Sequence, residues 1–303
     1  MASPPDTGAL TTEGRNPRTA YLDTMSAIEI VRVMNAENAT VAAAVGREAG
    51  AIAAAVEGIA ARFARGGRLI YVGAGTSGRL GVLDASECPP TFNTSPEQVV
   101  GLIAGGRRAL TEAVEAAEDD PAMGAADIAA TNVTAADTVV GVAASGCTPY
   151  VLGAVAEARR RGAFTVGVAC NAGTPLGRAV DVAIEVVVGP EVVSGSTRLK
   201  AGTAQKMVLN TLSTGALVLS GKTYGNLMVD MRATNEKLRQ RAVRIVQEAT
   251  GRDADGATTA LADAGGEIKT AIVATLAGVT PDVARARLAQ HGGRVRAAVE
   301  REA

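Results

Sequence analysis

One stretch decides the fold of this chain: Gly73-Ala-Gly-Thr-Ser-Gly-Arg-Leu-Gly-Val-Leu-Asp-Ala-Ser-Glu-Cys-Pro-Pro90. It directly follows the apolar run Arg68–Val72, which has the pattern of a buried parallel strand. Thr76 and Ser77, bracketed by glycines, then open a predicted helix. A strand, a tight glycine turn and a helix N-terminus form an anion site, because free backbone N–H groups and the helix dipole favour phosphate.

A second stretch repeats this arrangement later in the chain. The apolar run that begins at Val139 leads into Ser145-Gly146 and then Thr148, just before Pro149. The carboxyl ends of parallel strands meet at one edge of a doubly wound sheet, where small ligands bind. The two loops together therefore predict a site for one phosphorylated small molecule.

Neither loop has a complete nucleotide signature. Gly73-x-Gly75-x-x-Gly78 satisfies the dinucleotide pattern, but no acidic residue ends a second strand about 20 residues later, as ribose recognition requires. Asp84 and Glu87 lie inside or just after the first predicted helix, and the chain has no phosphate-binding loop of the G-x-x-x-x-G-K-[ST] type. A sugar phosphate is favoured over a dinucleotide.

Composition and charge restrict the class of protein further. Of 303 residues, 47% are hydrophobic but only 2% are aromatic, so we expect a core of Ala, Val, Leu and Ile with closely packed helices. A net charge of −1 gives no reason to expect nucleic acid or an anionic membrane as partner. Residues 1–20 do not resemble a signal peptide and no run of 18 apolar residues occurs, so a cytoplasmic protein is expected.

The cysteines do not indicate a metal site. Cys88, Cys147 and Cys170 lack metal-ligand spacing, and the single histidine, His291, cannot complete a zinc site with them. We therefore expect reduced thiols, no metal and no cofactor. Cys88 and Cys147 do fall in the two informative loops, which leaves a thiol nucleophile as an alternative.

Strands and helices alternate through the middle of the chain, which predicts an α/β fold with a doubly wound parallel sheet. The expected strands are Leu69–Val72, Val99–Ala104, Thr138–Ala143, Thr165–Ala169 and Val182–Val188, with helices at about 77–87, 107–117, 122–131 and 149–161.

The two ends of the chain have a different pattern. Residues 1–18 resemble a flexible or extended arm, and two helices broken near Asn35–Asn38 follow, the first opened by a Ser26–Glu29 capping box. A long helix is expected from the Gly195 region to about Leu219, then one over Asn235–Thr250. The predicted domains are 1–57 (arm and helices), 58–221 (sugar-phosphate domain) and 222–303 (helical region, with a small all-helical domain at about 254–303).

Several long motifs make the family recognisable. The chain closely resembles the N-acetylmuramic acid 6-phosphate etherases, members of the sugar isomerase (SIS) fold group. The matching segments run over nearly the whole chain: Thr12–Pro17, Leu22-Asp23, Met34-Asn35, Gly73–Pro90, Gly101–Gly106, Glu118–Asp120, Ala144–Tyr150, Cys170-Asn171, Gly195–Lys206 and Asn226–Asp230. Asn38 and Asn93 depart from residues common in the family, and neither departure touches the matched glutamates.

The resemblance implies cleavage of the lactyl ether of N-acetylmuramic acid 6-phosphate to N-acetylglucosamine 6-phosphate and D-lactate. It also implies that two glutamates and no metal do the work: Glu87 as proton donor and Glu118 as the second acid/base. The two loops described above supply the residues predicted to bind the substrate's phosphate, which are Thr76, Ser77, Ser145, Gly146 and Thr148. A homodimer is expected because SIS relatives pair, and because the apolar helices at 41–63 and 204–219 exceed what one sheet covers.

The reaction explains why two carboxyl groups are needed. Opening the sugar ring exposes an aldehyde at C1, which acidifies the C2 proton. One carboxylate removes that proton, and one carboxylic acid assists departure of the lactate oxygen from C3 before water adds back. Two carboxyl groups in different protonation states suffice for these steps.

Simpler interpretations remain open for the same residues. Glu87 and the Glu118-Asp-Asp120 run have the pattern of solvated surface, and Thr76, Ser77, Ser145 and Thr148 are residue types that cap helices. Arg198, Lys200 and Lys206 fit a surface face equally well. Two rival functions also fit the fold: a phosphosugar isomerase with a single base, and a non-enzymatic sugar-phosphate sensor, which could have lost either glutamate.

Overall fold

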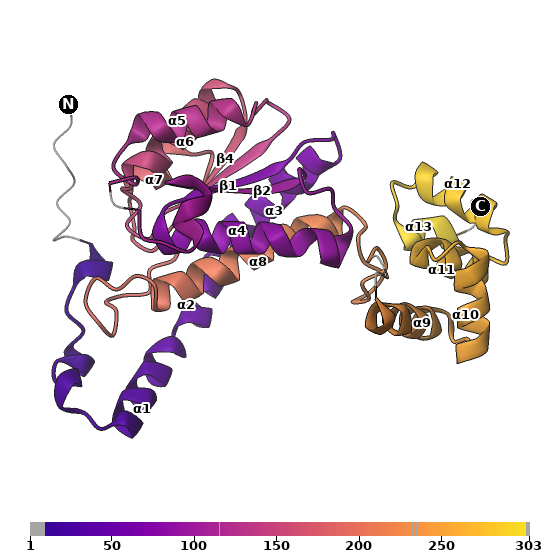
Figure 1. Cartoon of the computed structure of the whole chain (residues 1–303), viewed down its shortest axis with the longest axis horizontal. Coiled ribbons are helices and arrows are strands. Elements are labelled where there is room, and N and C mark those ends of the chain that lie inside the picture. The colour runs from indigo at the N-terminus through magenta and orange to yellow at the C-terminus, as the bar shows by residue number, and fades with distance from the viewer. Residues whose placement is uncertain (1–9, 115, 232, 234, 301–303) are drawn as a thin grey trace. The chain divides into compact units, whose positions relative to one another are not determined.

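The computed structural model describes residues 10–300 except positions 115, 232 and 234 (Figure 1). Internal contacts divide the chain into two compact units. The sheet unit consists of Met1–Ser86 with Glu97–Ser213, and the C-terminal unit consists of Glu87–Pro96 with Thr214–Ala303. Residues 1–9 of the predicted arm and position 115 of a predicted helix lie outside the described residues.

The sheet has five parallel strands in the order β2-β1-β3-β4-β5. In this register Leu69 pairs with Val99 on one side and with Thr138 on the other. All five predicted strands are confirmed, with ends that differ by up to three residues. Their bounds are β1 Leu69–Gly73, β2 Val99–Ile103, β3 Thr138–Val142, β4 Phe164–Ala169 and β5 Val182–Glu185.

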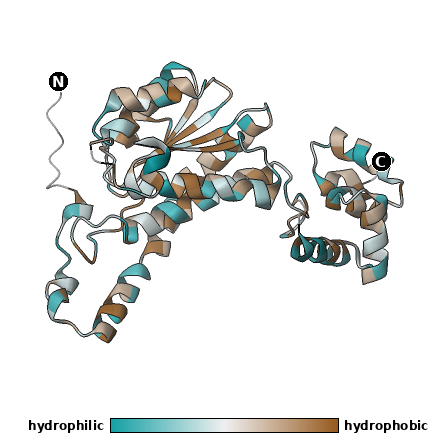
Figure 2. Cartoon of the chain, in the orientation of Figure 1, coloured by the Kyte–Doolittle hydropathy of each residue, from teal (hydrophilic) through white to brown (hydrophobic). Residues whose placement is uncertain are grey.

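Helices cover both faces of this sheet, as expected for a doubly wound fold (Figure 1). One face carries α5 (Pro121–Ala130), α6 (Pro149–Arg160) and α7 (Pro175–Ala179). The other face carries α3 (Ala49–Phe63), α4 (Gly75–Phe92) and α8 (Lys200–Leu219). The strands between these layers are largely apolar (Figure 2), and alternate side chains of β1 enter each layer, because successive residues of a strand point to opposite faces.

Small residues allow the helices to pack closely. Ile70 and Val72 of β1 share a core with the α5–α6 pair, whereas the Tyr71 hydroxyl donates to Asp84 of α4 at 2.8 Å. A Cβ added at Gly124 of α5 would lie 1.9 Å from the Tyr150 carbonyl oxygen of α6. At Gly153 of α6 it would lie 2.0 Å from the Pro121 oxygen. The glycines therefore set the distance between α5 and α6.

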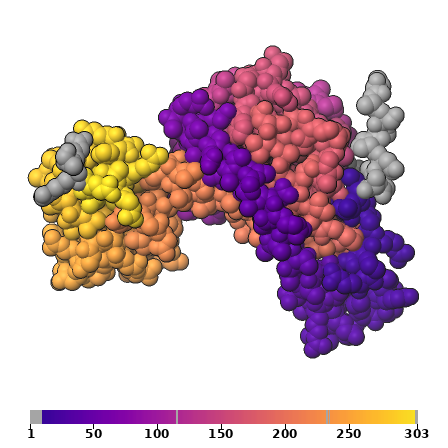
Figure 3. Space-filling model, turned by 180° about the vertical axis from the view of Figure 1, so that it is seen from behind, coloured from indigo at the N-terminus to yellow at the C-terminus, as the bar shows by residue number. Residues whose placement is uncertain are grey.

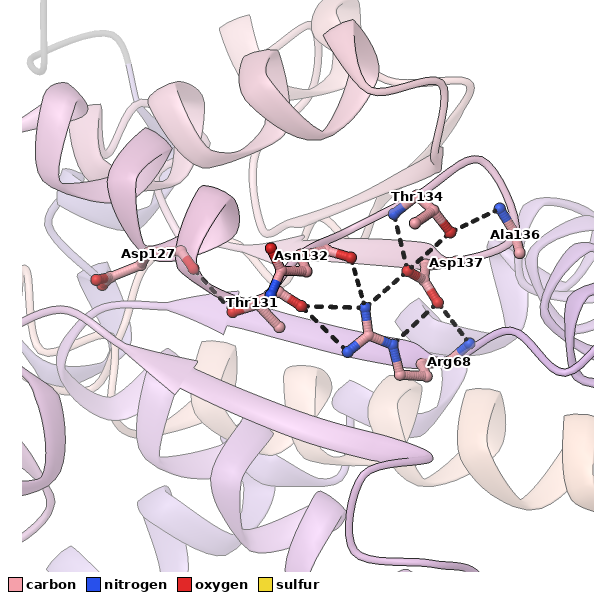
Figure 4. Close-up of polar contacts among 7 residues, drawn as sticks. All are labelled: Arg68, Asp127, Thr131, Asn132, Thr134, Ala136 and Asp137. Carbon is pink, nitrogen blue, oxygen red and sulfur yellow. Dashed lines mark hydrogen bonds and ion pairs between the residues drawn. The ribbon is translucent and has the colours of Figure 1, made fainter.

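An ion pair joins the amino-terminal ends of β1 and β3 (Figure 4). The Arg68 side chain donates to both Asp137 oxygens, at 3.1 and 2.8 Å, and the Arg68 backbone N–H donates to the first of these at 2.9 Å. The Thr134 N–H donates to the second oxygen at 2.9 Å, and the Arg68 guanidinium also reaches the Thr131 carbonyl. Burial alone would raise the pKa of Asp137, but these hydrogen bonds lower it overall.

The N-terminal segment differs from the prediction. Its described part is neither flexible nor extended: it forms three short 3₁₀ turns, Thr11–Glu13, Pro17–Thr19 and Leu22–Thr24. Thr19 donates through its hydroxyl to the Val192 carbonyl at 2.9 Å, so the segment is fixed to the sheet unit.

Three helices follow where two were predicted: α1 (Ala27–Asn38), α2 (Val41–Arg47) and α3. The first break is at Ala39-Thr40, after the expected Asn35–Asn38, and a second break at Glu48 was not foreseen. The predicted capping box is confirmed, because Glu29 accepts from the Ser26 N–H at 2.8 Å. Figures 1 and 3 show α1 (indigo) projecting from the rest of the sheet unit.

The predicted helix over 107–117 is wrong. Among the described residues of this range, only a 3₁₀ helix forms, over Gly106–Leu110. Arg79 of α4 donates to the carbonyl oxygens of Leu110 and Glu112, at 3.1 and 3.0 Å, and a continuing helix would need those acceptors. Ala116 then takes a positive φ of 60°, which no right-handed helix accommodates.

The C-terminal unit is helical, as predicted. Its helices are α9 (Glu236–Thr250), α10 (Ala254–Asp263), α11 (Ile268–Ala277), α12 (Pro281–Gln290) and α13 (Val295–Val299), and they enclose one apolar core. Asp230, from the matched segment Asn226–Asp230, accepts from Lys222 at 2.8 Å and from Lys269 at 2.9 Å. A cavity of about 710 Å³ lies beside this cluster.

Within the described part of the chain, no single helix has the length and apolar character needed to cross a membrane. One bent pair of helices, Ala27–Arg47 with Ala49–Phe63, is long and apolar enough to cross a membrane, by length and composition only.

Candidate active site

The strand order places the two predicted loops side by side. β1 continues through α4 to β2 on one side, whereas β3 continues through α6 to β4 on the other. The connections therefore leave the neighbouring strands β1 and β3 in opposite directions, and a crevice forms at the carboxyl ends of such a pair. The loops after these two strands contain Thr76 and Ser77, and Ser145 to Thr148.

In the first loop, α4 starts almost immediately after the strand. Gly75 has a φ of +50°, and a Cβ added at Gly78 would lie 2.7 Å from the Gly73 oxygen, so the glycines allow helix and strand to meet. Thr76 is half-buried. Ser77 is buried, and its hydroxyl donates to Oε1 of Gln205 at 2.9 Å. Ser77 is therefore held between α4 and α8.

In the second loop the hydroxyls are more open. Ser145 and Thr148 are half-buried, and the Ser145 hydroxyl accepts from the Cys147 N–H at 3.1 Å. Gly146 between them has a φ of +71°, and a Cβ there would lie 2.4 Å from the Thr174 side chain. Thr148 occupies the N-cap of α6 without making a side-chain capping hydrogen bond. The capping interpretation is therefore wrong for Thr148, whose hydroxyl remains open to a ligand.

Glu118 is anchored to this second loop through its backbone. Its carbonyl oxygen accepts from the Tyr150 N–H, in the first turn of α6, at 3.0 Å, and its side chain is exposed. Asp120 caps α5 by accepting from the Ala122 and Met123 N–H groups. The acidic run is thus a helix start whose first member, Glu118, projects its carboxylate into solvent.

Glu87 has a different setting. It lies on the last turns of α4, with an exposed side chain, in the segment that groups with the C-terminal unit. The structure thus brings Ser145, Gly146, Thr148 and the Glu118 backbone together, and places Thr76 and Ser77 on the neighbouring loop.

The thiols are poor nucleophile candidates. Burial raises the pKa of Cys147, with a smaller opposing effect of Arg178, and burial raises the pKa of Cys170 to about 12. A thiol with a raised pKa is protonated near neutral pH, and the thiolate is the reactive form. Cys88 is buried. These surroundings favour the interpretation of all three cysteines as packing residues.

The basic residues at the start of α8 divide into two groups. The surface interpretation is wrong for Lys200, which is 3% exposed and pairs with buried Glu37 at 2.7 Å. Arg198 and Lys206 are exposed and line a cavity of about 260 Å³ together with Thr76. No acidic residue is among the described residues that line this cavity, so it favours an anion beside the first loop.

Sequence reasoning missed two groups at this edge. Gln205 is the first of them. It could have been noticed as a polar residue on the buried face of α8, which it shares with Ala201, Ala204 and Val208. The other is Asn171, which follows β4. Its amide nitrogen donates to Thr12 at 3.1 Å and to the Ala144 carbonyl at 3.0 Å, so the N-terminal segment supports the backbone just before Ser145.

Similarity to known proteins identifies the family. Residues 51–159 match the model described as glucokinase regulatory protein N-terminal SIS domain, and residues 114–215 match that of the SIS domain. Proteins named N-acetylmuramic acid 6-phosphate etherase are 57% identical in Streptomyces avermitilis (96% of this chain and 93% of that protein) and 58% identical in Rubrobacter xylanophilus (96% of both). The chain belongs to the N-acetylmuramic acid 6-phosphate etherase family.

A further etherase, from Mycolicibacterium smegmatis, is 57% identical over 97% of this chain and 99% of its own length. Among solved structures, a putative phosphosugar isomerase from Bacteroides fragilis is similar with 19% identity and a TM-score of 0.49, covering 66% of this chain and 98% of that one. The expected α/β SIS fold is confirmed by the SIS domain match and the parallel sheet.

The sequence segments that resemble the etherase family lie in both units, and they include Gly73–Pro90 and Asn226–Asp230. Within the described residues, no group of three or more His, Cys, Asp or Glu side chains has the arrangement of a metal site.

Proposed function

We propose that this chain cleaves the D-lactyl ether of N-acetylmuramic acid 6-phosphate, releasing D-lactate and N-acetylglucosamine 6-phosphate, in amino-sugar and cell-wall recycling. The observation that carries the proposal is the match of 57–58% identity, over nearly the whole chain, to proteins named for this reaction. The open hydroxyls at the β1–β3 switch point support a phosphorylated sugar as substrate.

The phosphate binds the two loops in this proposal. Ser145 and Thr148 donate through their hydroxyls and Gly146 through its backbone N–H, at the N-terminus of α6, while Thr76 and Ser77 donate from the first loop. Support comes from the half-buried positions of Ser145, Thr148 and Thr76 and from the positive ends of α4 and α6. Hydrogen bonds from these groups to a dianion are charge-assisted.

The two glutamates move the protons. With the sugar ring open, one carboxylate removes the C2 proton, and the C3–O bond breaks with its electron pair leaving on the lactate oxygen, which takes a proton from the other carboxyl. Water then adds to the resulting double bond at C3, and a proton returns to C2. Glu87 serves as the proton donor and Glu118 as the second acid/base, roles that rest on the family motifs and on their exposed carboxyls.

The chain also works as a homodimer in the cytoplasm in this proposal. Ile28 and Val31 on α1 are 54% and 61% exposed, an unusual setting for large apolar side chains at adjacent turns of one helix. A second copy of the chain would cover them. Sedimentation at micromolar concentration should give a dimer, and a stable, active monomer would contradict this part.

The reaction itself is tested by isotope labelling with purified protein and N-acetylmuramic acid 6-phosphate. In H₂¹⁸O, label should enter C3 of the amino sugar and be absent from the lactate hydroxyl, because the C3–O bond breaks. In D₂O the product should carry deuterium at C2. Label in the lactate hydroxyl, or no deuterium at C2, contradicts the mechanism. A rearranged phosphosugar without lactate would instead indicate an isomerase, and binding without any product a sensor.

A further inference from the structure

Ser77 and Gln205 form a buried pair behind the first loop. Gln205 is 1% exposed and Ser77 8%, and Ser77 Oγ lies 2.9 Å from Gln205 Oε1 as a donor. A serine hydroxyl has one proton and two lone pairs. In this arrangement the proton is used by Gln205 and is not available to a ligand.

The other end of the same amide is unsatisfied. Gln205 Nε2 is buried and has no hydrogen-bond partner among the described residues, which costs free energy because a buried donor has lost its water. A half-turn of the amide exchanges its oxygen and nitrogen. The nitrogen would then donate to Ser77 Oγ, and the Ser77 proton would be released toward the crevice.

We propose that Gln205 is a positioning residue that sets the direction of the Ser77 hydroxyl. With phosphate bound, the Gln205 amide donates to Ser77, and Ser77 donates to a phosphate oxygen, so that both hydrogen bonds point at the anion and strengthen each other. This inference rests on the proposed function, in which Ser77 contacts the phosphate. The neighbouring cavity supports it, because Lys206 and Thr76, adjacent in sequence to Gln205 and Ser77, line a basic approach to this loop.

A purely structural link between α4 and α8 is the alternative, and the chain offers a matched control for it. Asn210, also on α8, donates to Asp84 of α4 at 2.6 Å, so it joins the same two helices. Asn210→Leu should disturb the helix contact without touching Ser77. A structural role predicts equal effects of changes at Gln205 and Asn210 on ligand affinity.

The experiment measures the inhibition constant of inorganic phosphate, with KM and kcat, for the full-length protein. Gln205→Met should raise the inhibition constant and KM about tenfold and change kcat less than threefold, the size expected when one charge-assisted donor is lost. Gln205→Glu is nearly isosteric and removes the amide donor, so at a pH high enough to ionise the new carboxyl it should only accept, hold the Ser77 proton and weaken phosphate binding further. Asn210→Leu should leave phosphate affinity within twofold.

A double-mutant test separates action through Ser77 from a direct contact. In a Ser77→Ala background, Gln205→Met should add less than twofold, because the group it positions is absent. An additive effect, an unchanged inhibition constant in Gln205→Met and Gln205→Glu, or an equal shift in Asn210→Leu would each overturn the proposal. Circular dichroism of the near-isosteric Gln205→Glu variant checks that it folds. Release of lactate by the unaltered protein tests the proposed function separately.

Discussion

Two polar groups, one at each edge of the parallel sheet, differ in how their hydrogen bonds are satisfied. At the amino-terminal edge, Asp137 accepts five hydrogen bonds, from the backbone and side chain of Arg68 and from the backbone and hydroxyl of Thr134 (Figure 4). At the carboxyl-terminal edge, Thr148 occupies the N-cap position of α6 but its hydroxyl makes no capping hydrogen bond, and the Gln205 amide nitrogen is buried without a partner among the described residues.

The difference separates stability from function. A closed network such as that of Arg68 and Asp137 lowers the free energy of the folded state, because each charged group meets its complement. Donors left open at the other edge add no such stability and are available for an anion. Substitutions at the amino-terminal edge should therefore alter stability alone, and substitutions at the carboxyl-terminal edge should alter catalysis or binding alone.

The largest effect is expected for the glutamates. Glu118→Gln and Glu87→Gln should each lower kcat at least 10²-fold, because an amide neither takes nor gives the proton that the reaction needs. Both side chains are exposed, so the melting temperature should change little. Lactate release measured beside a thermal melt checks this. Activity within threefold of the unaltered chain for either variant would remove that glutamate from the mechanism.

Asp137→Asn should have the opposite effect, lowering stability while leaving activity nearly unchanged. Loss of the charge leaves Arg68 without its partner, and we expect the free energy of unfolding to fall by about 3 kcal/mol. Well below the melting temperature, kcat and KM should stay within twofold. Urea unfolding with kinetics on the same sample makes the comparison. A tenfold loss of kcat in the folded variant would show that the two edges are not independent.

Removal of the Ser145 or Thr148 hydroxyl should weaken substrate binding. Ser145→Ala and Thr148→Ala each remove a donor to the phosphate, and KM should rise about tenfold, since such bonds contribute roughly 1.5–3 kcal/mol. The unfolding free energy should stay within about 0.5 kcal/mol for Thr148→Ala and should fall by about 1 kcal/mol for Ser145→Ala, which also removes the acceptor of the Cys147 N–H. Unchanged KM in both variants would move the phosphate site elsewhere.

The smallest expected effect is on the loss of stability at acidic pH. The pKa of Asp137 is lowered in the folded state, so its contribution to stability is present above the unfolded pKa of about 3.9 and is lost as the pH falls through the folded value. Urea midpoints measured from pH 6 down to pH 3 should fall less steeply for Asp137→Asn than for the unaltered chain. Parallel curves would mean that Asp137 does not carry this dependence.

Local patterns sufficed for the strands and for the loops after them. Buried runs such as Leu69–Val72, followed by glycine and hydroxyl residues, predict strand, turn and helix start from neighbouring residues alone. The parallel order and the long family motifs then led to Thr76, Ser77, Ser145, Gly146, Thr148, Glu87 and Glu118 as candidate site residues. Their catalytic and binding roles stay predictions.

Contacts between residues distant in sequence decided the rest. The predicted helix at 107–117 is absent because Arg79 binds two of the carbonyl oxygens that it would need. Lys200 is buried because it pairs with Glu37. The N-terminal turns are ordered because they bind Asn171 and Val192. Ser77 and Gln205 are 128 residues apart, and neither shows in its own neighbourhood that it has a partner. A side chain's hydrogen-bond partner depends on which elements pack together, so propensity and periodicity predict the elements, and only the tertiary structure decides which polar groups are satisfied and which stay open.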